Sequence, residues 1–234
     1  MSLTRKALLI MSPDEEIPGV MIDKENWNNH LHSPTGGAWQ GSEVQLLVSP
    51  TRSELISAMN WLNVADYTFI AYSGHGSARS ETETILNIND QQTIAARDLI
   101  SKAAKQTLIL DCCRRLQRRG ITEARLIKSI AMDSYKDPNL ARILFDQHLR
   151  DCAPFRVQLN SCSLDQYAGD DDTAGGIYTA ALIRSAQATP SGKVLGIREA
   201  HHAARQVVID LQPSQTPTGM YPRSGPSFPF GIGL

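Results

Sequence analysis

The sequence "YTFIAYSGHG", residues 67–76, passes from an apolar run into a histidine that lies between two glycines. A short apolar run that ends in small or polar residues is typical of a buried strand opening into a loop. The sequence "TLILDCC", residues 107–113, shows the same pattern and ends in two cysteines. Loops that follow parallel strands meet at one edge of an α/β sheet, where such folds form their sites. The two stretches therefore predict a single site with an imidazole and a thiol, the minimum for a cysteine nucleophile and its base.

The bulk composition predicts an ordinary globular protein. The chain has 234 residues, 41% hydrophobic and 20% charged, with a net charge of −1. This balance gives no reason to expect nucleic acid or an anionic membrane as a partner. The apolar runs have the length of strands rather than of membrane spans, and residues 6–11 predict a first strand rather than a signal peptide. Four irregularly spaced cysteines predict no disulfide framework and favour a reducing, cytoplasmic location.

Strands and helices are expected to alternate along the chain. We expect strands at residues 6–11, 44–48, 67–72, 107–110 and 156–160, and helices at residues 24–32, 50–62, 95–105, 175–186 and 197–210. A small hairpin is expected at residues 84–94, and an edge strand or a surface tail from residue 212. The pattern predicts a single α/β domain of three layers, with about six mostly parallel strands and helices on both faces.

The candidate site has the parts that acyl transfer needs. A thiol becomes a nucleophile as the thiolate, which a nearby imidazole such as His75 can produce. The Gly76 amide is unobstructed by a side chain, and with the amide of the cysteine it can donate to an oxyanion. Asp111 precedes Cys113 by two residues, and its charge would attract a basic side chain and reject an acidic one.

Other reactive residues have simpler interpretations. We expect Cys152 and Cys162 to be structural, and the pair at residues 201–202 to have a surface or capping role, since no third metal ligand has suitable spacing. The acidic run at residues 170–172 could bind a hard cation, but a solvated acidic loop is the favoured interpretation. We therefore expect no metal and no other cofactor.

These motifs resemble the caspase-fold cysteine peptidases, and most of all their metacaspase-like bacterial members. Tyr-Ser-Gly-His-Gly and Asp-Cys-Cys resemble the family's histidine and cysteine motifs in the expected order. Weaker similarities lie at residues 19–23, 160–166, 175–179 and 215–217.

The resemblance implies a role for each matching residue. His75 would be the general base and Cys113 the nucleophile, with the oxyanion held by the amides of Gly76 and Cys113. The pocket for the substrate residue before the cut (P1) would consist of Asp23, Ser73, Asp111 and, as a weaker candidate, Asp165. Such a pocket implies an endopeptidase that cleaves proteins or peptides after arginine or lysine.

The resemblance also implies a division of the chain. Residues 1–113 would correspond to the family's large subunit and residues 155–234 to its small subunit, with a variable basic loop or insertion at 114–154. Residues 114–116 are Arg-Arg-Leu, where metacaspases usually have His-Ser-Gly. The basic stretch 114–119 is either a self-cleavage site or a charged surface loop. No acidic cluster for calcium is visible between residues 77 and 100.

Two other interpretations stay open. A catalytically silent caspase-like scaffold, or a zymogen activated by a protein partner in a defence or cell-death system, is compatible with the altered sequence after Cys113. A flavodoxin-like nucleotide-binding module is less favoured, because the glycines around His75 lack both phosphate-loop spacings.

Overall fold

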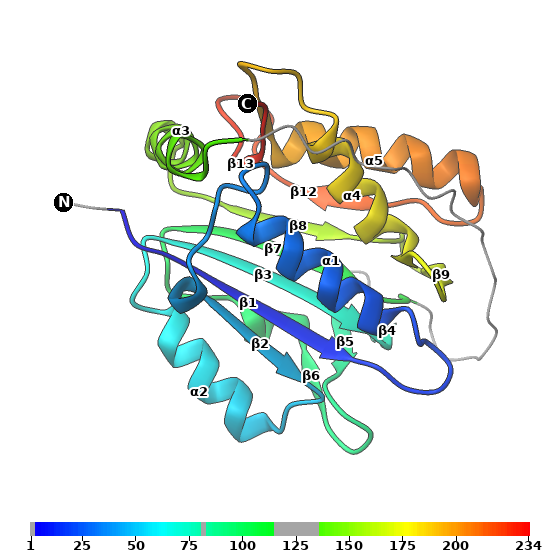
Figure 1. Ribbon diagram of the computed structural model, residues 1–234. Coiled ribbons are helices and arrows are strands. Elements are labelled where there is room, and N and C mark those ends of the chain that lie inside the picture. The colour runs from blue at the N-terminus through cyan, green and yellow to red at the C-terminus, as the bar shows by residue number, and fades with distance from the viewer. Residues whose placement is uncertain (1–2, 81–82, 115–135) are drawn as a thin grey trace.

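A six-stranded sheet forms the centre of the computed structural model, which describes residues 3–80, 83–114 and 136–234 (Figure 1). Its strands, in spatial order, are β12 (Thr218–Met220), β8 (Arg156–Asn160), β7 (Lys105–Asp111), β3 (Tyr67–Gly74), β1 (Arg5–Ser12) and β2 (Val44–Val48). Every neighbouring pair is parallel except β12 and β8. The predicted α/β sheet of about six mostly parallel strands is confirmed.

Alternating side chains of the central strands supply two hydrophobic cores. In β1, Leu9 and Met11 point into one core while Leu8 and Ile10 point into the other, and all four are fully buried. The first core is covered by helices α1 (Val20–His32), α3 (Pro138–Asp151), α4 (Ile177–Gln187) and α5 (Ile197–Leu211). The second is covered by α2 (Arg52–Leu62) and the small sheet β4 (Gly76–Ala78), β5 (Thr84–Asn87) and β6 (Thr93–Ala95). Figure 1 shows these helices on opposite faces of the sheet, which confirms the three layers.

The expected helix at residues 95–105 is wrong. Residues 93–95 pair with β5, and β7 already begins at Lys105, so the sheets leave room for only the single 3₁₀ turn η2 (Ala96–Leu99). The remaining short elements are η1 (Gly41–Glu43), β9 (Asp170–Asp171), β10 (Gly175–Gly176), β11 (Val194–Gly196) and β13 (Pro229–Ile232). Within the described ranges, no helix is long and apolar enough to cross a membrane.

The segment 114–154 contains a helix that the sequence did not predict. Residues 115–135 lie outside the described residues, and α3 follows them. The buried guanidinium of Arg5 fixes α3 to the sheet, because its Nη1 lies 3.3 Å from Asp146 Oδ1. The same side chain lies over the rings of Trp39 and Phe145, at 4.6 and 4.7 Å.

We predict that Trp27→Ala lowers the free energy of unfolding by about 3–5 kcal/mol, the usual cost of removing a buried aromatic side chain. Trp27 is fully buried in α1, and its ring packs against Phe69 and Phe230. Urea denaturation would measure the loss, with the partly exposed Trp61→Ala as the matched control. Equal losses for the two variants would show that α1 is not held by this aromatic contact.

Candidate active site

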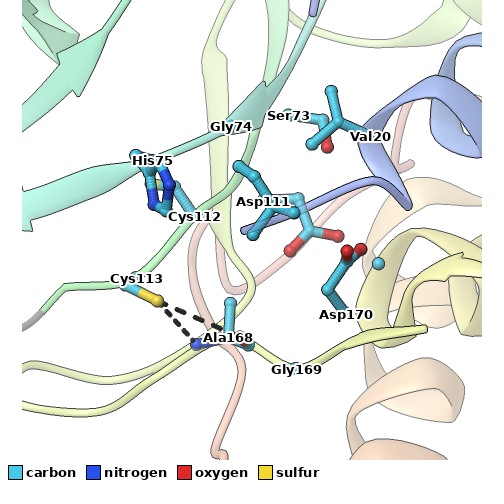
Figure 2. A pocket seen from close by; sticks show the side chains of 12 residues that line it. Val20, Ser73, Gly74, His75, Asp111, Cys112, Cys113, Ala168, Gly169 and Asp170 are labelled. Carbon is cyan, nitrogen blue, oxygen red and sulfur yellow. Dashed lines mark hydrogen bonds between the residues drawn. The ribbon is translucent and has the colours of Figure 1, made fainter. Parts of the chain in front are cut away.

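The carboxyl ends of β3 and β7 form the floor of a cavity at one edge of the sheet. Ser73 and Asp111 lie opposite each other in the register of these parallel strands. The loops that follow bring His75 and Cys113 to the same cavity. Figure 2 shows these side chains around the opening, which is lined by Ile17, Val20, Ser73, Gly74, His75, Asp111, Cys112, Cys113, Ala168, Gly169, Asp170 and Gly176.

Two buried carboxylates, Asp111 in the cavity lining and Asp23 behind it, are held by defined hydrogen bonds. Asp23, fully buried in α1, accepts from Ser73 Oγ at 2.5 Å and from the Gly176 amide at 2.9 Å. Asp111 is 5% exposed and accepts from both the amide and the hydroxyl of Thr179, at 3.1 and 2.7 Å. Three of the four predicted pocket residues are thus joined to one another or to the same helix end.

That helix end is the N-terminus of α4. Gly176 occupies its N-cap position without a side chain to cap it, and Thr179 belongs to its first turn. The free amides of a first turn need acceptors, and the carboxyl oxygens of Asp23 and Asp111 supply them from elsewhere in the chain. A side chain at position 176 cannot be accommodated, since its Cβ would lie 2.3 Å from Asp111 Oδ2 and 3.0 Å from Asp23 Oδ2.

Burial disfavours the ionised form of both carboxylates. Desolvation raises the pKa of Asp23 well above its ordinary value, and the nearby Asp111 raises it further, against the hydrogen bonds from Ser73 and Gly176. Desolvation likewise raises the pKa of Asp111, against the hydrogen bonds of Thr179 and Ser161. In the absence of a cation, burial therefore favours the protonated form of these two carboxyls over the charged form.

Asp170 is the second carboxylate that lines the cavity, and the interpretation of residues 170–172 as a solvated loop is wrong for it. Its Oδ2 accepts from the amide of Gly19, the N-cap residue of α1, at 3.0 Å, which turns the carboxylate inward (Figure 2). Desolvation is the main cause that raises its pKa to about 6, and Asp111 adds to it. Only Asp172 of the acidic run is exposed. The sequence showed the acidic run but not the backbone amide that draws its first residue inward.

The contact between Gly19 and Asp170 explains why the predicted start of the first helix is wrong. The expected helix begins at residue 24, whereas α1 begins at Val20. Gly19 has no side-chain cap, so the sequence around it lacks a local start signal. The acceptor comes from Asp170, which is 151 residues away.

The candidate nucleophile and base both line the cavity. Cys113 is partly exposed, and its Sγ accepts from the Ala168 amide at 3.3 Å. The backbone oxygen of His75 lies 2.7 Å from Tyr72 Oη and accepts from the Asn87 amide at 3.0 Å, which fixes this loop. The imidazole Nε2 lies 2.6 Å from Asp14 Oδ2, a contact that the sequence did not suggest.

Gly76 lies directly against the two cysteines. A Cβ at this position would be 2.6 Å from Cys112 Sγ and 2.9 Å from the Cys113 oxygen. Only glycine allows the histidine loop to approach the cysteine loop this closely. Cys112 is buried in the second core, and desolvation raises the pKa of its thiol well above the ordinary value.

Asp165 is not brought to the cavity. It is exposed, has a φ of 60°, and donates its amide to the Arg114 oxygen at 3.0 Å. Arg114 itself is buried, with its Nε donating to Thr84 Oγ1 at 3.2 Å. The rest of the proposed self-cleavage stretch, residues 115–119, lies outside the described residues.

The remaining cysteines and histidines lie elsewhere or serve the core. Cys152 and Cys162 are buried free thiols. The expected surface or capping role is wrong for His201, which is buried and lies 2.6 Å from Tyr178 Oη; desolvation lowers its pKa to about 4. His202 is exposed. Among the residues that the structure describes, no group of three histidine, cysteine or carboxylate side chains is placed to hold a metal ion.

Comparisons with known proteins agree with the fold described above. The structure resembles the crystal structure of caspase-1 from Spodoptera frugiperda, with a TM-score of 0.59 and 12% sequence identity over 94% of this chain and 86% of that one. A search of curated protein sequences found no significant match. The family model of the caspase domain, which describes cysteine-type peptidases, matches residues 4–221. The chain therefore belongs to the caspase family.

Proposed function

We propose that the protein is a cysteine endopeptidase that cleaves proteins or peptides after arginine or lysine. The observation that carries the proposal is the acidic lining beside the thiol: Asp111 and Asp170 line the cavity, and Asp23 lies behind them, hydrogen-bonded to the lining residues Ser73 and Gly176. The charged groups that act on Asp23 and Asp170 are other carboxylates. A guanidinium or ammonium group would supply the missing positive charge.

The proposed reaction uses the two loops of the cavity. His75 takes the proton of the Cys113 thiol, and the thiolate attacks the carbonyl carbon of the scissile bond. The amides of Gly76 and Cys113 donate to the oxyanion that forms, where no side chain at position 76 intervenes. His75 then protonates the leaving amine, and water hydrolyses the thioester to release the acid and regenerate the thiol.

Specificity would come from the cost of leaving the carboxylates unpaired. A basic P1 side chain would restore ionised Asp111 and Asp23, which burial disfavours in the empty cavity. An acidic P1 side chain would add a like charge to a desolvated site, and a neutral one would leave the site uncompensated. The hydrogen bonds from Thr179, Ser73 and Gly176 hold the carboxylates in place for this role.

One contact favours a second candidate, a zymogen or scaffold that depends on a protein partner. The amide of Ala168 donates to Cys113 Sγ at 3.3 Å, and in this alternative the segment would have to shift to let a substrate reach the sulfur. An activating partner and a place in a defence or cell-death system belong to this second candidate, whereas a metacaspase-like bacterial origin and a cytoplasmic location are proposed for either candidate. Restoration of peptidase activity by addition of a partner would favour the zymogen.

We predict that peptides with arginine or lysine at P1 are hydrolysed and that the matched aspartate peptide is not. Asp111→Asn should lower kcat/KM for the arginine peptide about 30-fold to more than 1000-fold, because removing one partner of a buried charge pair costs about 2–5 kcal/mol. The asparagine keeps an acceptor for Thr179, so folding should be affected less than selectivity. Fluorogenic peptides would measure the rates, with Cys113→Ala as the inactive control. Equal cleavage after arginine and aspartate would contradict the proposed pocket.

The matched variants Asp165→Asn and Asp170→Asn test which acidic residue of the following loop belongs to the pocket. Asp170 faces the cavity and Asp165 does not, so the arginine preference should fall in Asp170→Asn and stay unchanged in Asp165→Asn. The measurement is the ratio of kcat/KM for arginine over citrulline, its uncharged isostere. The reverse result would restore Asp165 and exclude Asp170.

The arginine preference should also weaken in acid. The pKa of Asp170 is raised to about 6, so its charge is present above that pH and is lost as pH falls through it. At pH 5 roughly nine-tenths of the Asp170 carboxyls carry a proton. The arginine-to-citrulline ratio should therefore fall between pH 7.5 and pH 5, and fall less in Asp170→Asn. A ratio that does not change with pH in the unmodified protein would contradict this prediction.

A further inference from the structure

A carboxylate outside the cavity lining contacts the candidate base. Asp14 lies in the segment between β1 and α1, and its Oδ2 is 2.6 Å from His75 Nε2. The side chains of Asp14 and His75 are 35% and 32% exposed, so the pair is partly open to solvent rather than buried in the core. An ion pair this exposed contributes little to stability. The short distance between Asp14 and His75, together with the role of His75 as the candidate base, points instead to a role for Asp14 in the reaction.

The carboxylate of Asp14 is itself fixed. Its Oδ1 accepts from the amides of Glu16 and Ile17, at 2.8 and 3.1 Å, which forms a tight turn around the side chain. This leaves Oδ2 directed at His75. The two oxygens thus have separate tasks: one holds the loop and the other holds the imidazole. Ile17, the second donor of this turn, also lines the cavity.

The contact determines which nitrogen of His75 can act as the base. An ionised carboxylate only accepts hydrogen bonds, so Nε2 carries the proton that is donated to Asp14. Nδ1 is then the unprotonated nitrogen. A base that is held in one tautomer by a carboxylate is the arrangement that makes a histidine effective beside a nucleophile.

We infer that Asp14 is a positioning residue that completes a Cys113–His75–Asp14 triad; this inference rests on the proposed peptidase function. Asp14 keeps Nδ1 of His75 free to take the thiol proton and stabilises the imidazolium that results. When His75 gives the proton from Nδ1 to the leaving amine, the hydrogen bond from Nε2 to Asp14 persists. Asp14 touches neither the substrate nor the sulfur in this scheme.

Glu16 provides a matched comparison within the same loop. Its Oε2 is 3.9 Å from His75 Nε2, beyond hydrogen-bond distance, and its side chain is 49% exposed. A general effect of negative charge near the imidazole would involve Asp14 and Glu16 alike. A hydrogen bond that selects the tautomer involves Asp14 alone.

The decisive variant is Asp14→Asn. Its side-chain oxygen can still accept from the amides of residues 16 and 17, so the turn is kept, but the group that faces His75 becomes a donor. His75 then has to accept at Nε2 and place its proton on Nδ1, the wrong tautomer for a base. We expect kcat for the arginine peptide to fall about tenfold to a hundredfold with little change in KM, part of the ~10²–10⁴-fold that a placed acid–base group contributes. Glu16→Gln should stay within about twofold of the unmodified protein.

A second measurement is independent of peptidase activity. Iodoacetamide alkylates thiolates, and Cys113 is the one cysteine that is not buried among the four, all of which the structure describes. The rate of Cys113 alkylation, followed by mass spectrometry of the modified peptide, should fall in Asp14→Asn and in His75→Ala. In the His75→Ala background, Asp14→Asn should have no further effect, because Asp14 acts through His75.

The outcomes separate the inference from the proposed function. If no peptide is cleaved but alkylation slows in Asp14→Asn, the triad stands and the peptidase assignment fails. If peptides are cleaved and Asp14→Asn changes neither kcat nor the alkylation rate, the triad is refuted and the peptidase stands. A rise in kcat on Asp14→Asn would also refute the inference, since it would mean that Asp14 holds His75 away from the thiol. Denaturation midpoints of the variants confirm that all are folded.

Discussion

The site depends on the pairing of buried carboxylates with the N-termini of two helices. The start of α4 has no side-chain cap of its own and donates its amides to Asp111 and Asp23, while Gly19, the N-cap residue of α1, donates to Asp170. These contacts join β7, α1, α4 and the loop after β8, which are far apart in sequence. The free amides would be costly if buried without acceptors, and the carboxylates would be costlier still without donors. The amides therefore lower the cost of burying the carboxylates, and the carboxylates lower the cost of burying the amides.

The hydrogen bonds offset only part of the cost of burying Asp23 and Asp111, and the remaining cost favours binding of a cation. Hydrogen bonds from Ser73, Thr179 and Gly176 oppose the desolvation of Asp23 and Asp111, but the pKa values of both remain raised. A binding site that is electrostatically unsatisfied when empty gains most from the ligand that satisfies it. The glycines at positions 175 and 176 allow this closeness, because a Cβ at either would lie within about 2.3 Å of a carboxylate oxygen. The same tight packing brings Gly76 against the cysteine loop.

Local sequence signals predicted the elements whose start or pattern is determined by residues close together in the sequence. The capping box of Thr51 and Glu54 marks the start of α2, and apolar runs mark the central strands. The histidine and cysteine motifs could be placed together because parallel strands end at one sheet edge. What could not be predicted depends on contacts over long sequence distances. Asp170 and the start of α1 depend on each other across 151 residues, and Asp14 reaches His75 by loop geometry that no residue pattern encodes. The helix expected at residues 95–105 failed for a similar reason, since strand pairing on both sides left room for one turn.

The most direct test of the account is covalent labelling of Cys113 with an arginyl acyloxymethyl ketone, compared with the aspartyl analogue of the same length. Mass spectrometry locates the modified residue and gives the rates. We predict labelling of Cys113 by the arginyl reagent and little by the aspartyl one, with the preference lost in Asp111→Asn. Equal labelling by the two reagents, or labelling that does not depend on Asp111, would contradict the central claim that the buried carboxylates select a cation beside the nucleophile.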